Sequence, residues 1–177
     1  MQRIAFMFAA ALVCATCGHP AAGFVTPPPP PPAPGTAIRV VTSMDLLDCP
    51  SGATAPPPVI INDTMSDNPV HDGAGDVLNV RARGARRGTS VSLQRQARPY
   101  RAVDATASGA VTNAAITLDI TDCAVLPRNV TVVRHVSGDT WEDVGDGRGV
   151  TTTGAGRRTV STGRLTHLSI YALAGGN

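Results

Sequence analysis

The sequence predicts an all-β protein: a single antiparallel β-sandwich, preceded by a signal segment, a polyproline stalk and an irregular loop. Three observations favour this fold. Hydrophobic and polar residues alternate along many short stretches, as they do in strands with one buried face. Residues that favour helices are scarce, since the 177-residue chain has a single glutamate and no lysine. Turn-forming stretches such as RGARRG, SGD and GDGRG separate the alternating stretches at fairly even intervals.

Residues 1–17 have the character of a secretory signal. Arg3 supplies a positive charge, and the unbroken apolar run IAFMFAAALVCA extends from Ile4 to Ala15. This run is shorter than the roughly 20 residues that a membrane-spanning helix needs. A basic start, a short apolar stretch and small residues are typical of an export signal. We therefore expect an exported protein of the outer membrane, the periplasm or the cell surface.

Two kinds of processing are compatible with this leader. An ordinary signal peptidase could cleave after the small residues at 13–15 or at 21–23. Alternatively, Cys17 becomes the first mature residue and carries lipid, because the stretch CATC resembles a bacterial lipobox in Ala15 and Cys17. Several acyl chains on one cysteine are enough for stable anchoring. We expect Cys17 to be lipidated and to hold the chain at a membrane.

The residues that follow form a spacer and then a long loop. Residues 18–36 include Pro27–Pro32, which must adopt polyproline II and form a stiff stalk of roughly 25 Å. Residues 37–75 are predicted to be irregular, because Pro56–Pro58 exclude a central strand there. Residues 76–177 are predicted to form the sandwich.

The strand prediction depends on period-2 alternation in three stretches. These are VLNVRARG with Leu78, Val80 and Ala82 inward, TSVSLQR with Val91 and Leu93 inward, and AITLDIT with Ile116, Leu118 and Ile120 inward. Further strands are predicted at 129–136, around Trp141, at 158–161 and at 168–172. Aromatic residues make up only 3% of the chain, so the core must consist of Val, Ile, Leu and Ala.

Two cysteines, Cys49 and Cys123, remain after the leader. In an exported protein an even pair indicates a disulfide. A metal site would need further soft ligands at short spacing, and the sequence has none. We expect these cysteines to form a bridge.

An arginine run is the strongest compositional oddity. Seven arginines and no acid lie between Val77 and Val103, namely Arg81, Arg83, Arg86, Arg87, Arg95, Arg98 and Arg101. If residues 77–83 and 89–95 pair as a hairpin, Arg81 and Arg83 point into solvent, with Arg86 and Arg87 at its tip. Guanidinium groups suit phosphate and carboxylate, so these four are candidate contacts for a polyanion.

The partners considered for such a face are acidic polysaccharide and anionic lipid headgroups. Nucleic acid is not expected outside the cell, and apart from Tyr100 the run lacks the aromatic residues on which bases stack. The alternative is an ordinary solvated face that keeps an edge strand from pairing with other chains.

Five blocks of the sequence, in order, point to a known family. They are RGTSVSLQR, PYRAVDATASG, AITLDITDC, VTVVRHVSGDTWEDVG and TVSTGRLTHLSIYALAG. The series resembles the ZU-five domain of ankyrins, netrin receptors and zonula-occludens scaffolds, in the form found on bacterial surface lipoproteins. It covers residues 75–175, and HLSIYA at 167–172 is its most specific part. The family's Pro-x-Gly-Ala turn stands here as residues 82–85 without its proline. The resemblance implies a β-sandwich for protein interaction or surface display, with no catalytic residues to carry over.

Catalysis and metal binding have weaker support. His71, His135 and His167 lie among many Ser and Asp residues, but Gly-x-Ser-x-Gly, Cys–His and His-Glu-x-x-His signatures are absent. We expect His167 to lie on a strand, packed or hydrogen-bonded at the sheet edge. Two groups of acids were considered for calcium, and neither has EF-hand spacing. These are Asp139, Glu142, Asp143 and Asp146, and Asp63, Asp67, Asp72 and Asp76.

The function expected from the sequence is therefore that of a non-enzymatic surface display or protein-interaction module, without cofactor or metal. Its partner would be an unknown envelope protein or an acidic polysaccharide. An arginine-rich polyanion-binding module and a secreted hydrolase are the alternatives.

Overall fold

Strands make up all the regular elements in the described part of the chain. The structure, a computed structural model, describes residues 40–42, 45–124, 126–127 and 129–176. The predicted signal segment, the lipidation site Cys17 and the polyproline stalk lie outside the described residues. No helix among those residues is both long enough and apolar enough to cross a bilayer.

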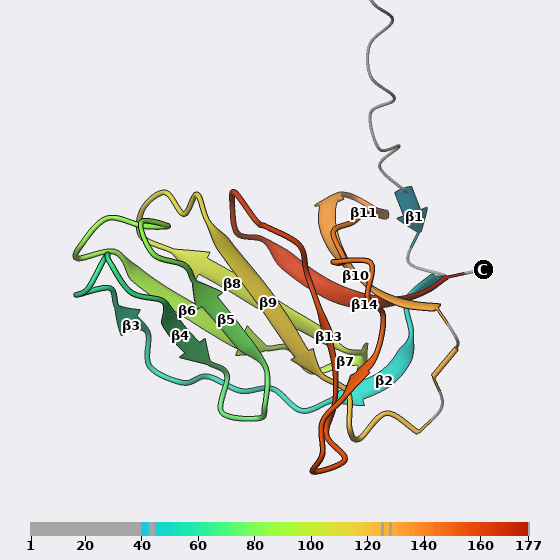
Figure 1. Ribbon diagram of the computed structural model, residues 1–177. Coiled ribbons are helices and arrows are strands. Elements are labelled where there is room, and N and C mark those ends of the chain that lie inside the picture. Colours follow the sequence, from blue (N-terminus) through green and yellow to red (C-terminus); the bar gives the residue numbers. More distant parts are fainter. Residues whose placement is uncertain (1–39, 43–44, 125, 128, 177) are drawn as a thin grey trace, which may run out of the picture. The chain divides into compact units, whose positions relative to one another are not determined.

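The strands form two antiparallel sheets that pack into a sandwich, together with a two-stranded sheet (Figure 1). The larger sheet has the order β1 (Val40–Thr42), β11 (Thr140–Asp143), β10 (Asn129–Ser137), β14 (Ile170–Gly176), β8 (Ala102–Ala107), β6 (Ser90–Arg95) and β3 (Val59–Ile60). The smaller sheet has the order β12 (Thr151–Thr152), β13 (Arg158–Ser161), β9 (Ala114–Asp119), β5 (Val77–Val80) and β4 (Asn68–His71). The third sheet pairs β2 (Asp48–Ser51) with β7 (Arg98–Tyr100). The predicted all-β sandwich is confirmed.

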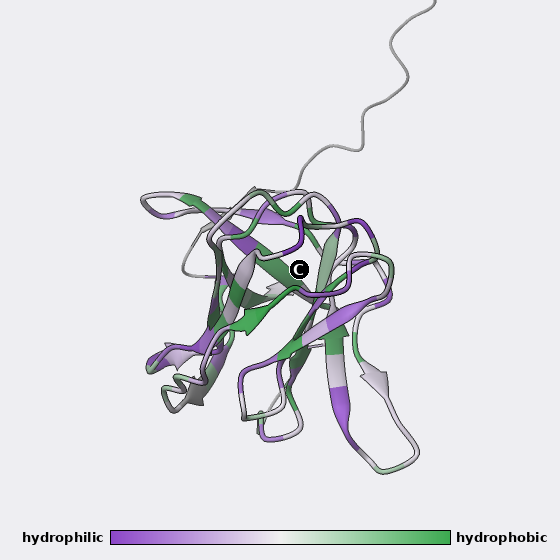
Figure 2. Ribbon diagram, turned by 90° about the vertical axis from the view of Figure 1, so that its left-hand side faces the viewer, coloured by the Kyte–Doolittle hydropathy of each residue, from purple (hydrophilic) through white to green (hydrophobic). Residues whose placement is uncertain are grey.

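The predicted alternation produces the core between the two main sheets. Leu78 and Val80 of β5 face Val91 and Leu93 of β6 within one buried cluster, and each is fully buried. The inward residues of AITLDIT, Ile116 to Ile120, are fully buried as well. Burying each such side chain contributes roughly 1.5–3 kcal/mol. Hydrophobic and hydrophilic bands follow one another along the strands in Figure 2.

A second, smaller cluster covers the outer face of the larger sheet. Trp141 packs there with Val133 and with alanines of β8 and β14. Tyr100 meets the Trp141 ring edge-on, with the ring centroids 6.3 Å apart. The His135 ring lies 5.0 Å from the same indole. The single tryptophan therefore packs on the outer face of this sheet and not between the two sheets.

The disulfide between Cys49 and Cys123 is confirmed. It joins β2 to the segment that follows β9, with an S–S distance of 2.02 Å and the two Cα atoms 5.2 Å apart. Both cysteines are buried. The bridge therefore fastens a segment that precedes the first core strands to one sheet of the sandwich.

The expectations for residues 37–75, for the strand at 168–172 and for the place of His167 need correction. Residues 37–75 are not simply irregular, because β1 to β4 lie there and pair with β11, β7, β6 and β5. The proline-rich 56–58 stretch itself contains no strand. The strand expected at 168–172 begins only at Ile170, and His167 lies before it, exposed to solvent.

The expected hairpin of residues 77–83 with 89–95 is wrong. Strand β5 pairs with β4 and β9, whereas β6 pairs with β3 and β8. The chain therefore crosses between the two layers after Val80, and the buried residues of β5 and β6 belong to the same core cluster. The arginines that follow Val80 thus belong to a crossing loop and not to a hairpin.

Candidate functional site

The loop between β5 and β6, residues 81–89, lies at one end of the sandwich and is called the arginine loop below. In Figure 1 it is at the left, and β1 lies at the other end of the domain. Figure 2 views the domain from the side of this loop. Arg81, Arg83, Arg86 and Arg87 are all exposed, as expected for side chains that point into water.

Backbone hydrogen bonds fix the arginine loop to its neighbours. Within the loop, the Gly84 N–H donates to the Arg81 carbonyl at 2.8 Å, and the Thr89 N–H donates to the Arg86 carbonyl at 3.1 Å. Five further bonds reach other segments: Arg81 N–H to Asn113 O at 3.0 Å, Arg83 N–H to Thr64 O at 2.7 Å, Gly88 N–H to Ile61 O at 2.8 Å, Ile61 N–H to Thr89 O at 2.9 Å, and Thr112 N–H to Gly84 O at 2.7 Å. The loop therefore holds its arginines on a fixed backbone.

Arg81 differs from the other three arginines, because an acid neutralises it. Its guanidinium lies 2.8 Å from Asp67, whose carboxylate also accepts the backbone N–H of Ala82. The Ala82 N–H and then Arg81 hold the pKa of Asp67 below its ordinary value. Arg83, Arg86 and Arg87, in contrast, have no ion pair with any described residue.

Arg83 has an unusual backbone conformation. Its φ is 59°, and among the described residues it is the only one other than glycine with a positive φ. This conformation costs an L-residue roughly 1 kcal/mol. The neighbouring glycine serves another purpose, because a Cβ on Gly84 would lie 2.2 Å from the carbonyl oxygen of Asn113. An arginine is thus kept where glycine would be easier to accommodate, which makes the side chain of Arg83 a candidate for function.

Arg164 joins this end of the domain from a distant part of the sequence. Its guanidinium donates to the carbonyl of Thr112 at 3.3 Å, and the N–H of Thr112 donates to Gly84 of the arginine loop. Leu165 pairs with Ala114 and so brings Arg164 to this position. Its place could not be predicted from the sequence, since no local pattern connects Arg164 to the arginine loop.

Two arginines of the run are buried, which corrects the expectation of one positive face. Arg95 continues the inward alternation of β6 and lies at the end of the sandwich away from the arginine loop, against Asp72 and Asp76. Its Nε donates to Asp76 Oδ2 at 2.9 Å and lies 3.1 Å from Asp72 Oδ2. That second contact is an ion pair without hydrogen-bond geometry, because Asp72 Oδ2 has no hydrogen-bond partner among the described residues. Burial raises the pKa of Asp76 to about 7, although Arg95 opposes the rise.

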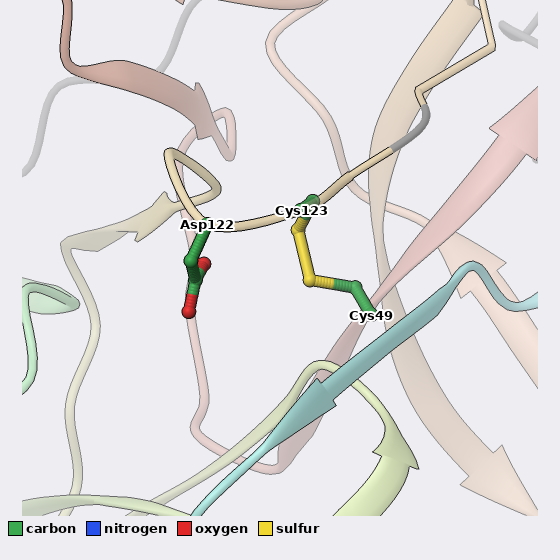
Figure 3. Close-up of side chains that lie close together, drawn as sticks. All are labelled: Cys49, Asp122 and Cys123. Atoms are coloured by element: carbon green, nitrogen blue, oxygen red, sulfur yellow. A yellow bond between two sulfur atoms is a disulfide. The ribbon is translucent and has the colours of Figure 1, made fainter.

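Arg101 is completely buried beside the disulfide. One of its terminal nitrogens pairs with Asp122, which is 63% exposed, and lies 3.6 Å from the sulfur of Cys49. Figure 3 shows Asp122 next to the bridged Cys49 and Cys123. These three side chains have the proximity of a metal site, but both sulfurs are bonded to each other. The group is therefore a structural one.

His135 and His167 form no catalytic triad with Ser169, and His71 is exposed on β4. His135 and His167 line a groove of about 520 Å³ together with Ser169. The Ser169 hydroxyl donates to the backbone carbonyl of His135 and not to a ring nitrogen. The His135 ring bonds to the carbonyl of Gly138, and the exposed His167 ring bonds to Thr166. His167 is therefore hydrogen-bonded, one of the two arrangements expected, but it is exposed and does not lie on a strand.

The acids considered for calcium have protein partners. Asp143 accepts bonds from the Thr131 hydroxyl and from the N–H of Gly145. Asp146 accepts the N–H of Arg148, and Glu142 pairs with Arg134. In the other group, Asp63 accepts the N–H of Met65. Asp67 forms an ion pair with Arg81, and Asp72 and Asp76 form ion pairs with Arg95. Each carboxylate named here stabilises a turn or an ion pair, and Asp139, the remaining acid of the first group, is not without a partner either.

No protein-family model, curated protein or solved structure matches this chain. The similarity to the ZU-five domain therefore stays a prediction.

Proposed function

We propose that this chain is an exported, non-enzymatic display or interaction module, held at a membrane by lipid on Cys17 and carried on the proline-rich stalk. The observation that supports a binding role most directly is the arginine loop. Arg83, Arg86 and Arg87 are exposed there without ion-pair partners among the described residues, on a backbone that is hydrogen-bonded to its neighbours. Among the residues considered for catalysis or metal binding, the rings of His135 and His167 and the carboxylates of Glu142 and Asp143 contact other groups of the protein.

Cell fractionation tests the anchoring part of this proposal. The Cys17→Ser variant should move from the membrane to the soluble fraction, because it lacks the sulfur that would carry lipid. The matched control is Cys14→Ser, which changes a cysteine of the same leader and should leave the protein in the membrane. A wild-type protein that is already soluble, with an N-terminus beyond Cys17, would show that the stalk is only a linker.

Polyanion binding is a second candidate function, and the exposure of Arg83, Arg86 and Arg87 favours it, whereas the charge of Arg81 is neutralised by Asp67. Acidic polysaccharide and anionic lipid headgroups both have suitable chemistry, since carboxylate and phosphate accept paired hydrogen bonds from a guanidinium. Such binding should weaken steeply as salt rises, because exposed charges are screened.

Retention on heparin resin tests this candidate with two variants of equal net charge. Arg86→Gln with Arg87→Gln should elute at lower salt than the wild type. Arg98→Gln with Arg148→Gln removes two exposed arginines elsewhere and should elute as the wild type does. Equal shifts in both variants would mean that net charge alone controls retention.

A further inference from the structure

Exposed apolar side chains lie beside the unpaired arginines. Only three large hydrophobic side chains are strongly exposed among the described residues: Ile60 at 47%, Met65 at 64% and Val136 at 54%. Two of them, Ile60 and Met65, belong to residues 60–67, the segment that borders the arginine loop. Ile60 pairs with Ser90, and Met65 follows Thr64, whose carbonyl accepts the Arg83 N–H. This end of the domain is therefore both basic and apolar.

The basic charge here comes from two separate segments. Arg83, Arg86 and Arg87 of the arginine loop, with Arg164, are called the basic end below. Two acids lie in the bordering segment. Asp67 is neutralised by Arg81. The carboxylate of Asp63 accepts the N–H of Met65, and a side-chain hydrogen bond from Ser66 is the largest cause that holds its pKa below the ordinary value. The acids at this end thus have partners, and the four arginines exceed them in charge.

We infer that the basic end docks on an anionic bilayer, with its guanidinium groups against lipid phosphates and Met65 within the headgroup layer. The inference rests on the polyanion-binding candidate above and names its ligand. A polysaccharide would pair with the arginines but would leave the exposed apolar side chains without a partner. A lipid surface combines phosphates with an apolar layer beneath them, and so accommodates both kinds of side chain.

Vesicle sedimentation tests the inference on the full mature chain carrying Cys17→Ser, so that a lipid anchor contributes nothing. This protein should bind vesicles that contain phosphatidylglycerol and should not bind vesicles of phosphatidylcholine alone. Arg86→Gln with Arg87→Gln should weaken binding roughly 30-fold at low salt, since each arginine near an anionic surface contributes about a 5-fold increase in affinity. Arg98→Gln with Arg148→Gln, matched in charge, should bind as the unsubstituted protein does.

Two single variants separate a docking role from a merely structural one. Arg83→Gly relieves the positive φ and should fold at least as stably as the parent, yet bind about 5-fold more weakly to the anionic vesicles. Met65→Ser should weaken vesicle binding several-fold without changing the salt at which the protein elutes from heparin, because only the bilayer offers an apolar layer. Unchanged vesicle affinity in either variant would contradict the geometry proposed here.

Comparing retention on heparin with binding to vesicles distinguishes the polyanion-binding function from the bilayer inference. Retention on heparin without binding to anionic vesicles would refute the bilayer inference and leave the polyanion function standing, with polysaccharide as its partner. The absence of both would refute the two together. Binding to both, with the Met65 variant impaired only on vesicles, is the expected result.

Discussion

The buried ion cluster around Asp76 should make the stability of this protein depend on pH in a defined direction. Asp76 Oδ1 accepts the N–H of Asp119 at 2.8 Å, and its Oδ2 accepts Arg95. The carboxylate is fully buried, and burial raises its pKa from 3.8 to about 7. Asp72 reinforces the rise, while Arg95 and Arg101 oppose it. Two buried carboxylates thus share the guanidinium of Arg95, and the raised pKa of Asp76 favours the protonated form of that residue up to about pH 7.

The sign of the effect follows from proton linkage. Between pH 4 and pH 7 the folded protein retains a proton on Asp76 that the unfolded chain releases. The free energy of unfolding therefore falls as pH rises through this window, and Asp76 adds no further change above it. Each pH unit corresponds to about 1.4 kcal/mol, so the interval from 3.8 to about 7 amounts to roughly 4 kcal/mol.

The Asp76→Asn variant isolates this contribution, because the amide is uncharged at every pH and can still accept the N–H of Asp119. Urea unfolding, followed by the fluorescence of Trp141, should be measured for both proteins from pH 4 to pH 8. The stability of the variant relative to the wild type should increase by up to about 4 kcal/mol across this range. A difference that stays constant with pH would refute the reasoning and place the pKa of Asp76 near its ordinary value.

Three further predictions concern stability. Arg101→Met should raise the free energy of unfolding in urea by about 1 kcal/mol or more, because the buried guanidinium has two nitrogens without hydrogen-bond partners; a decrease would show that its ion pair outweighs desolvation. Replacing Cys49 and Cys123 together by alanine should lower stability by about 4 kcal/mol, given the 74-residue separation, whereas an unchanged urea midpoint would contradict this. Gly84→Ala should lower Tm strongly because its Cβ would lie 2.2 Å from a backbone oxygen, while Gly109→Ala, with 3.5 Å of clearance, should be tolerated.

Local alternation was sufficient to predict the fold class and most of the core. It placed Leu78 and Val80 inward, and the structure buries both. The disulfide was predictable because two cysteines, Cys49 and Cys123, remain after the expected export signal. The pairing of strands was harder to predict, because strands that follow one another in the sequence often form a hairpin. Here the chain crosses to the other sheet after Val80, a choice that depends on contacts across the core.

The sequence contains a pattern from which the buried position of Arg95 could be predicted. Arg95 follows Val91 and Leu93 at the same period-2 positions, and Asp76 precedes Leu78 in the same way. Charged residues in inward register at strand ends can pair across a sandwich, and these two do. Arg164 offered no such signal, because its place beside the arginine loop depends on the pairing of Leu165 with Ala114.

The outermost strands of both sheets are short. The larger sheet ends in β1, with three residues, and β3, with two, while the smaller sheet ends in β12, with two, and β4, with four. Pro69 in β4 also lacks the N–H that a neighbouring strand would need. The edge strands of the two main sheets therefore offer a neighbouring copy few backbone groups for pairing. A protein with such borders can be crowded densely on a surface while its copies resist joining into fibrils.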